Sequence, residues 1–256
     1  MEPNQPTLTA IILTYNEAAN IAACIDSLRW TDAILVFDSF STDDTVQIAT
    51  AAGARVVQRH FENYTTQRNA ALDAVESEWV LFVDADERST PEQAAEIRSR
   101  LANSSYQGYW IPRHNYIFGK LTRHTGWFPD YQMRLLCRAK ASYDTTRDVH
   151  ELVVLDGEAG YLTTPLIHYN YRDLAQFIGK QERYTDYAAR DLFRQGVRVK
   201  PQNYLLQPLR HFRWRYITLE GYRDGLHGFK LSVLMSWYEF QKYVRLRRAW
   251  NRGSAE

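Results

Sequence analysis

Two aspartates stand where carboxylates could bind a cation. Asp84 and Asp86 directly follow the apolar run WVLFV. Residues two apart on a strand point in the same direction, so we expect both carboxylates to face one hard divalent cation, which prefers oxygen ligands. An isolated Asp-x-Asp sequence is more often a solvated acidic turn. Its place directly behind a predicted buried strand favours the metal site here.

Polar residues also follow two earlier apolar runs. Thr14, Asn16 and Glu17 come after LTAIIL, and a cluster that begins with Asp38 comes after AILVF. The first glycine of the chain is Gly53. A GxGxxG turn or a P-loop behind the first run is therefore excluded, and with it the usual backbone cradle for a diphosphate. If these segments bind a nucleotide, a cation or a basic side chain must neutralise its phosphates.

The apolar runs read as strands buried on both faces, because they are continuous rather than alternating. Helical patterns separate them. Asn16 or Asn20 is placed to cap the first helix, and Thr90, Pro91 and Gln93 have the N-cap, N1 and capping-box chemistry of a later one. The four predicted strands of this part are 8–13, 33–37, 54–57 and 79–83.

Strands that alternate with helices predict an α/β fold with right-handed crossovers and a doubly wound, mainly parallel sheet. The ligand crevice of such a sheet lies at the carboxyl ends of its strands, where the polar clusters stand. The chain is predicted to be helical from residue 174 onward. Further strands are predicted at 109–113, 133–138, 152–155 and 161–167.

The composition is that of an ordinary globular protein with one main core. The 256 residues include 31 Lys and Arg against 30 Asp and Glu, and 45% are hydrophobic. Disorder is excluded, and the net charge makes no case for nucleic acid. The two cysteines, Cys24 and Cys137, have neither disulfide-framework nor zinc spacing. No basic leader and no run of eighteen apolar residues is present, so neither a signal peptide nor a membrane span is expected.

The charges are divided unevenly along the chain. Residues 1–171 carry a net charge of −8, whereas residues 172–252 carry +10. We therefore expect a catalytic domain at 1–171 and a basic, aromatic-rich helical extension at 172–256. Basic residues interleaved with Trp and Tyr over 201–252 predict contact with an anionic membrane surface. The alternative is that these helices only pack on the domain.

These motifs together resemble family 2 glycosyltransferases with the GT-A fold. The resemblance rests on the sequences TYNE (14–17), DSFSTDDT (38–45), QRN (67–69) and DAD (84–86), and it covers residues 7 to about 170. The later sequences FGK, GWFPD and VHE, and the helical extension, are more narrowly similar to enzymes that attach glucose to a heptose of the lipopolysaccharide core. The resemblance implies inversion, a nucleotide-sugar donor, and Mg²⁺ or Mn²⁺.

The resemblance also assigns roles at the donor. It implies that Asp38 accepts a hydrogen bond from the uracil N–H, with Thr14, Asn16 and Glu17 across the same crevice. Arg68 would add positive charge near the phosphates, or would be an ordinary helix-surface arginine. The donor residues are then Thr14, Asn16, Glu17, Asp38, Arg68 and Asp84, and the metal ligands are Asp86, Asp84 and His150.

An inverting displacement needs a base for the attacking hydroxyl. The resemblance places it at Glu151, with Asp148 and Asp130 as rivals. His150 would bind the metal, orient Glu151, or be structural. Many members of the family have Glu-Asp where this chain has His-Glu.

Aromatic and basic residues gather in one later loop. Rings stack on sugars and cations hold phosphate, so Trp127, Lys120 and Arg134 are predicted to bind an anionic or phosphorylated acceptor; the alternative is that the rings only pack the later strands. The resulting prediction is transfer of a hexose, preferably glucose, from a UDP-sugar to a lipopolysaccharide-core or other lipid-linked envelope acceptor. The enzyme would work in the cytoplasm, peripherally on the inner membrane.

Three other readings remain open. The acceptor could be a capsule precursor or a polyprenyl phosphate. The protein could be a catalytically silent nucleotide-sugar-binding scaffold of an envelope-assembly complex, although a binding module has little need of Glu151. A metal-dependent phosphohydrolase would need more carboxylates around two metals than this crevice offers.

Overall fold

The computed structural model describes residues 5–144 and 152–253 and divides the chain into two compact units. The first unit contains residues up to Arg113 and the segment Asp130–His168. The second contains His114–Pro129 and everything from Tyr169 onward. The predicted single boundary at residue 171 therefore differs from the observed division, because the segment 114–129 groups with the C-terminal helices.

The first unit is built on a seven-stranded sheet in the order β12-β6-β9-β4-β1-β2-β3. Its strands β3, β2, β1 and β4 are parallel neighbours, and β9 is antiparallel to both β4 and β6. This arrangement confirms the predicted mainly parallel α/β fold. The strands are β1 Leu8–Thr14, β2 Ala33–Asp38, β3 Arg55–Gln58, β4 Trp79–Asp84, β6 Gly108–Ile111, β9 Gln132–Cys137 and β12 Ala159–Tyr161.

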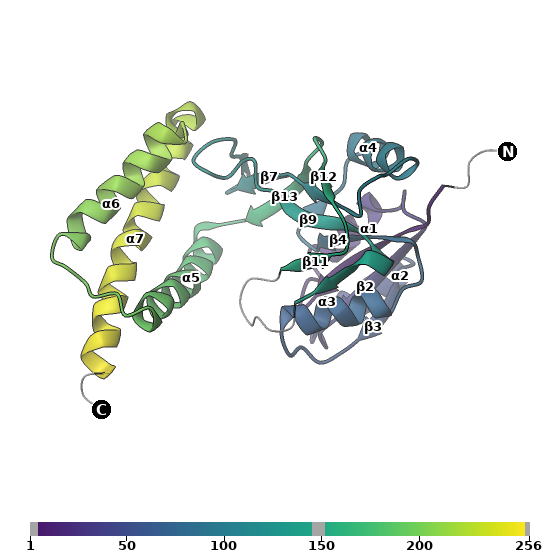
Figure 1. The fold of residues 1–256 in the computed structure, drawn as a ribbon, viewed down its shortest axis with the longest axis horizontal. Helices are drawn as coiled ribbons and strands as arrows, with labels where there is room; N and C mark the ends of the chain where they lie inside the picture. Colours follow the sequence, from purple (N-terminus) through teal and green to yellow (C-terminus); the bar gives the residue numbers. More distant parts are fainter. Residues whose placement is uncertain (1–4, 145–151, 254–256) are drawn as a thin grey trace. The chain divides into compact units, whose positions relative to one another are not determined.

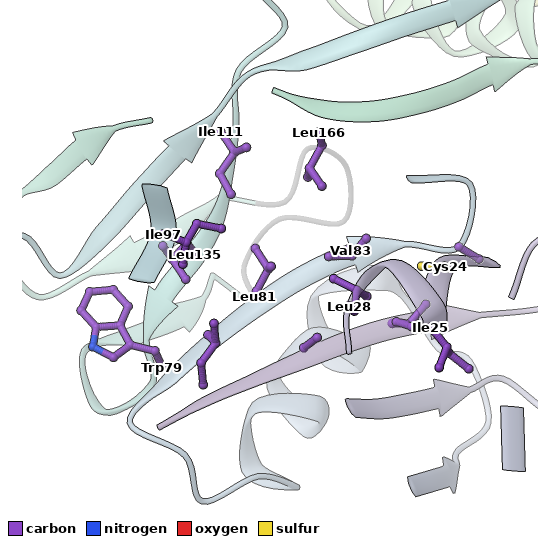
Figure 2. Packing of buried hydrophobic residues seen from close by; sticks show 14 of the residues in the cluster. Cys24, Ile25, Leu28, Trp79, Leu81, Val83, Ile97, Ile111, Leu135 and Leu166 are labelled. Atoms are coloured by element: carbon purple, nitrogen blue, oxygen red, sulfur yellow. The ribbon is translucent and has the colours of Figure 1, made fainter. Parts of the chain in front are cut away.

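The central strands are buried on both faces, as their continuous hydrophobicity predicts. In β4, Leu81 and Val83 face one cluster of buried side chains, which includes Cys24 and Ile25, while Phe82 faces another. Figure 2 shows the first of these clusters from close by. Helices therefore have to cover both faces of the sheet. They are α1 Ile21–Ser27, α2 Thr45–Ala51, α3 Tyr64–Asp73 and α4 Pro91–Leu101.

A local sequence signal places the start of α4, whereas the cap predicted for α1 is not formed. Thr90 caps α4, because its side chain accepts the backbone N–H of Gln93 at 3.2 Å, and Pro91 occupies the first turn. Asn20 precedes α1 but makes no side-chain cap bond; its amide instead donates to Glu17 at 2.7 Å.

One predicted strand is wrong. Residues 161–167 were expected to form a single strand, but β12 ends at Tyr161 and β13 Leu166–Tyr171 begins after a bend. In this bend Glu96 of α4 accepts the backbone N–H groups of Thr163 and Thr164. The short strands β5 Glu87–Arg88, β10 Ala141–Tyr143 and β11 Val153–Leu155 complete the first unit.

The second unit is mainly helical. It contains a core of Ile117, Tyr171, Phe177, Leu231 and Tyr238. Figure 1 shows α6 (light green) beside α7 (yellow). The elements are β7 Arg113–Ile117, β8 Lys120–Leu121, α5 Leu174–Arg194, α6 Asn203–Arg213, the π-helical turn η2 Trp214–Thr218, the 3₁₀ turn η3 Gly221–Asp224 and α7 Gly225–Gly253. Strands β7 and β13 each run from the first unit into the second.

Two glycines allow the corner between α6 and α7 to close. A Cβ atom on Gly228 would lie 1.9 Å from the carbonyl oxygen of Gly221, and a Cβ on Gly221 would lie 2.8 Å from the carbonyl oxygen of Arg215. Only a residue without a side chain fits at such a backbone contact. Within the described ranges, no helix combines the length and the apolar character needed to cross a membrane.

Candidate active site

The loops that follow β1 and β2 meet at a buried carboxylate. Asp38, the last residue of β2, is fully buried. Its Oδ1 accepts the hydroxyl of Thr14 at 3.0 Å and that of Ser41, and its Oδ2 accepts Ser41 N–H at 2.9 Å and Gln58 Nε2 at 3.0 Å. Four donors therefore hold this side chain in place.

The other residues predicted at this edge join the same two loops. Asn16 Oδ1 accepts the backbone N–H of Thr42 at 2.8 Å, while the N–H of Asn16 donates to Ser41 Oγ at 2.9 Å. The N–H of Glu17 donates to Thr45 Oγ1 at 2.8 Å. The structure thus brings Thr14, Asn16, Glu17 and Asp38 together, as expected for neighbouring parallel strands.

Asp84, at the carboxyl end of β4, is bound by two arginines. Arg134 of β9 donates from both terminal nitrogens to the two carboxylate oxygens of Asp84, with Nη1 at 3.1 Å from Oδ1. Arg68 of α3 approaches the same carboxylate, with Nη2 at 3.8 Å from Oδ1, and its guanidinium lies over the ring of Phe82. The side chain of Arg134 is almost completely buried. Arg134 was predicted to bind the acceptor; in the structure its guanidinium group pairs with Asp84.

The ionic network continues away from Asp84. Glu87 is fully buried, accepts the backbone N–H of Asp84 at 2.9 Å, and lies 3.6 Å from Arg134. Arg113 bridges two carboxylates: its Nη1 donates to Glu87 Oε1 at 3.1 Å, and its Nη2 donates to Asp130 Oδ2 at 2.6 Å. Three arginines and three carboxylates therefore alternate from Arg68 to Asp130, so the charges are balanced inside the first unit.

The ion pair between Asp84 and Arg134 stabilises the charged form of both side chains. Burial raises the pKa of Asp84, but the guanidinium groups of Arg134 and Arg68 outweigh it and hold the pKa well below its usual value. Burial lowers the pKa of Arg134, and the carboxylates of Asp84 and Glu87 reverse this, so its net pKa is raised. Asp84 is therefore an anion at neutral pH.

Asp86 points to a different partner. Strand β4 ends at Asp84, and residues 85 and 86 form a turn before β5, so the expected strand alternation does not extend to Asp86. Its carboxylate oxygen Oδ2 lies 3.5 Å from Nε2 of His168, which is brought there because β13 pairs antiparallel with β5. The two carboxylates of the DAD sequence thus have separate environments.

The residues around Asp86 suit a divalent cation that also binds substrate. Asp86 is partly exposed and supplies oxygen, and His168 supplies nitrogen. Residues 5–144 and 152–253 hold no ready-made group of three or more acidic, His or Cys ligands. Magnesium-type sites often use one or two carboxylates and complete their shell with phosphate oxygens and water. The donor set present therefore fits such an ion.

The predicted acceptor loop belongs to the second unit. Arg215 donates from Nη1 to the carbonyl of Thr125 at 2.6 Å, and its guanidinium lies 5.7 Å from the ring centre of Trp127. The N–H of Thr125 donates to the carbonyl of Leu219 at 2.9 Å. Burial lowers the pKa of Arg215 to about 10. The corner after α6 therefore shapes this loop, while Lys120 on β8 is exposed.

Three predicted site residues, Asp148, His150 and Glu151, lie outside the described residues. Sequence reasoning gave no role to Glu87 or His168. A carboxylate next to the DAD sequence and a histidine among the buried positions of a strand were the available signals. These sequence signals do not indicate which residues Glu87 and His168 contact. His168, for example, lies 82 positions along the chain from Asp86.

Comparisons with known proteins identify the family of this chain. The model of the family described as Glycosyl transferase family 2 matches residues 9–156. The lipopolysaccharide core biosynthesis glycosyltransferase LpsC of Rhizobium meliloti is 30% identical over 252 residues, which cover 94% of this chain and 91% of LpsC. An uncharacterized glycosyltransferase of Rickettsia conorii is 28% identical over 260 residues, covering 94% of this chain and 90% of its own.

Two solved structures share the fold. The mannosyltransferase PcManGT from Pyrobaculum calidifontis has a TM-score of 0.57 at 15% identity. The match covers 95% of this chain and 88% of the PcManGT chain. TarS of S. aureus has a TM-score of 0.50 at 15% identity, covering 93% and 91%. These likenesses extend over the C-terminal helices as well as the sheet.

Proposed function

Because this chain belongs to glycosyltransferase family 2, we propose that it transfers a hexose, preferably glucose, from a UDP-sugar with inversion at the anomeric carbon. The proposed acceptor is a lipopolysaccharide core or another lipid-linked envelope precursor at the cytoplasmic face of the inner membrane. Mg²⁺ or Mn²⁺ is the proposed cofactor. The enzyme class itself, a glycosyltransferase, follows from the family.

The observation that carries the proposal is the pair of separate environments of Asp84 and Asp86. Asp84 is neutralised by Arg134 and Arg68, whereas Asp86 faces His168 and remains partly exposed. Asp86 and His168 would hold the cation together with the diphosphate. A bound divalent cation would stabilise the negative charge that develops on the departing nucleotide.

The metal proposal has outside support. PcManGT was solved in complex with GDP-Man and Mn²⁺, and we extend the metal, though not the guanine base, to this chain. The choice of uracil rests on Asp38. For Asp38 to accept a uracil N–H, one of its four donors must move, and the side chain of Gln58 is a donor that can rotate away. Asp38 would then exchange one hydrogen bond for another.

The displacement needs a proton acceptor on the acceptor side of the sugar. The attacking hydroxyl oxygen forms a bond to the anomeric carbon, the bond from that carbon to the phosphate oxygen breaks, and the hydroxyl proton passes to the base. Asp130 is poorly suited to act as this base, because its carboxylate oxygens already accept hydrogen bonds from the side chains of Arg113 and Gln132. This occupancy favours Glu151, with Asp148 as its rival.

The acceptor class is inferred from LpsC and from the loop chemistry. LpsC is named for lipopolysaccharide core biosynthesis, and its likeness covers nearly the whole of both chains. In this chain, Lys120 offers an exposed cation for a phosphate, whereas Trp127 is only partly exposed and packs against the core of the second unit. Arg134 is too deeply buried at Asp84 for direct acceptor contact, so we assign it to the positioning of Asp84.

The test is hydrolysis of donor sugars without an acceptor. Purified protein is incubated with UDP-glucose, other UDP-hexoses and GDP-mannose, with Mg²⁺, Mn²⁺ or a chelator. We expect metal-dependent release of UDP, fastest from UDP-glucose, and its loss in the Asp86→Asn variant. The matched control is Asp156→Asn, at an exposed aspartate paired with Lys140. Full activity with chelator present, or equal rates for the two variants, would refute the metal role of Asp86.

A further inference from the structure

The helices of the second unit leave a large set of apolar side chains in solvent. Nine exposed residues, between 42% and 68% exposed, are here called the apolar face. They are Leu205, Leu206, Leu209, Trp214 and Ile217 on α6 and η2, and Leu226, Phe229, Val233 and Trp237 on α7. Single exposed apolar residues are common, but a large set of them on neighbouring helices indicates an interaction surface.

Helical spacing places the members from α7 on one side of that helix. Leu226, Phe229, Val233 and Trp237 follow the i, i+3, i+7, i+11 pattern of a single stripe. Leu231 and Tyr238, in contrast, are buried in the core of the second unit. The ring centres of Tyr238 and Phe177 lie 6.1 Å apart. A rotation of 100° per residue separates Tyr238 from Trp237, so the two side chains lie on different sides of α7.

The stripe on α7 adjoins α6. The ring centre of Phe229 lies 5.9 Å from that of Phe212 and 5.7 Å from that of Tyr216. Further along α7, the ring centre of Phe240 lies 6.0 Å from that of Tyr204, near the start of α6. The two helices therefore run antiparallel, side by side, as Figure 1 shows. The exposed stripe of α7 therefore lies beside α6, which carries the other members of the apolar face together with η2.

The same surface is basic. Arg210, Arg213 and Lys230 are exposed on these turns, among the apolar residues. From residue 195 to residue 253 the chain carries twelve Lys and Arg but three Asp and Glu. Exposed Trp, Phe and Leu beside cations suit the boundary between headgroups and acyl chains of an anionic bilayer.

A second copy of the chain fits this surface less well. A twofold interface places the same patch on both partners, so Arg210, Arg213 and Lys230 of one copy would meet those of the other. Repulsion between these like charges opposes such contact, whereas anionic lipid neutralises them. We propose that the apolar face is the membrane-docking surface of this protein, and that its occupant is an anionic lipid surface. The link to a lipid-linked acceptor rests on the function proposed above.

The experiment is sedimentation of the full chain with vesicles, without donor or acceptor. The vesicles are phosphatidylcholine alone, or phosphatidylcholine with phosphatidylglycerol, at low and high NaCl. We expect binding to the anionic vesicles at low salt and much weaker binding to the neutral ones. Salt should weaken the binding without abolishing it, because the apolar contacts are not screened.

Two variants separate the contributions. Leu209→Ser with Trp237→Ser should remove most binding at both salt concentrations. Neutralising Arg210, Arg213 and Lys230 with Gln should lower the partition coefficient by on the order of 100-fold at low salt, from about fivefold per cation. Controls on α5 change exposed aromatic and basic residues outside the apolar face. They are Tyr184→Ser with Tyr187→Ser and Arg183→Gln with Arg190→Gln, and both should bind like the wild type.

Three results would overturn the proposal. One is no binding to anionic vesicles at low salt. Another is an equal loss in the α5 controls. The third is a dimer in sedimentation equilibrium that dissociates in the Leu209→Ser, Trp237→Ser variant, because a second copy would then cover the face. Donor hydrolysis is measured in solution, so loss of vesicle binding with hydrolysis retained separates failure of this proposal from failure of the proposed function.

Discussion

At the scale of single residues, the arginine between Asp84 and Glu87 is the centre of the ionic network. Arg134 is the nearest cation to Asp84 and also lies 3.6 Å from Glu87. Substitution by Met would preserve the bulk of the side chain but leave both carboxylates short of a partner. We expect Arg134→Met to lower the free energy of unfolding by about 3–5 kcal/mol, measured by urea denaturation.

The control for this prediction is an arginine that is more exposed and more distant from its partner. Arg100 is half-exposed and lies 4.0 Å from Glu96. Arg100→Met should change the free energy of unfolding by about 1 kcal/mol or less. Equal effects of the two substitutions would mean that the network around Asp84 adds nothing to stability.

The base is a second question at this scale. Glu151→Gln keeps the size of the side chain and removes its ability to take a proton. We expect it to slow transfer by roughly 10²–10⁴-fold while donor affinity changes little. Rates are measured in single turnovers, with UDP binding measured by calorimetry. If Asp148→Asn gives the larger loss in rate, Asp148 is the base and Glu151 is not.

At the scale of elements, close packing at the α6–α7 corner depends on Gly228. A Cβ at this position would lie 1.9 Å from the carbonyl oxygen of Gly221, so α7 would have to shift. We expect Gly228→Ala to lower the free energy of unfolding by about 3 kcal/mol, the upper end of the usual cost of overpacking. Thermal and urea denaturation both measure it.

Another helical glycine provides the control. A Cβ on Gly179, in the second turn of α5, would meet no atom within 4 Å. Gly179→Ala should therefore stabilise the protein, by about 0.5–1 kcal/mol, because alanine loses less entropy in a helix. A stable Gly228→Ala variant would contradict the close backbone approach.

At the scale of the whole molecule, the division into two units predicts the effect of truncation. A chain that ends at residue 171 keeps Ile117 and Trp127 but loses Phe177 and Leu231, against which their cluster packs. We expect this fragment to expose apolar surface, bind a hydrophobic dye and aggregate on mild heating. Dye fluorescence and light scattering, compared with the full chain, measure the effect. A monomeric fragment with the thermal midpoint of the full chain would show that the segment 114–129 needs no helical partner.

Much of the fold could be predicted from the sequence, because its signals are local. Continuous apolar runs place β1, β2, β3 and β4, and their order along the chain predicts parallel crossovers. The cap at Thr90 is a contact across three residues and was predicted as such. The gathering of polar residues behind these strands follows from the rule that parallel strands share one carboxyl edge.

The remaining features depend on contacts between distant parts of the chain, which residue patterns do not encode. Residue spacing does not show that Arg134 turns to Asp84, that His168 meets Asp86, or that Tyr238 faces inward. Each outcome is decided by which strand or helix lies alongside, and by the cost of burying a charge without its partner. Composition and local periodicity therefore determined an acidic α/β part followed by a basic helical part. The tertiary structure alone decided which charges are paired inside and which apolar side chains remain in solvent.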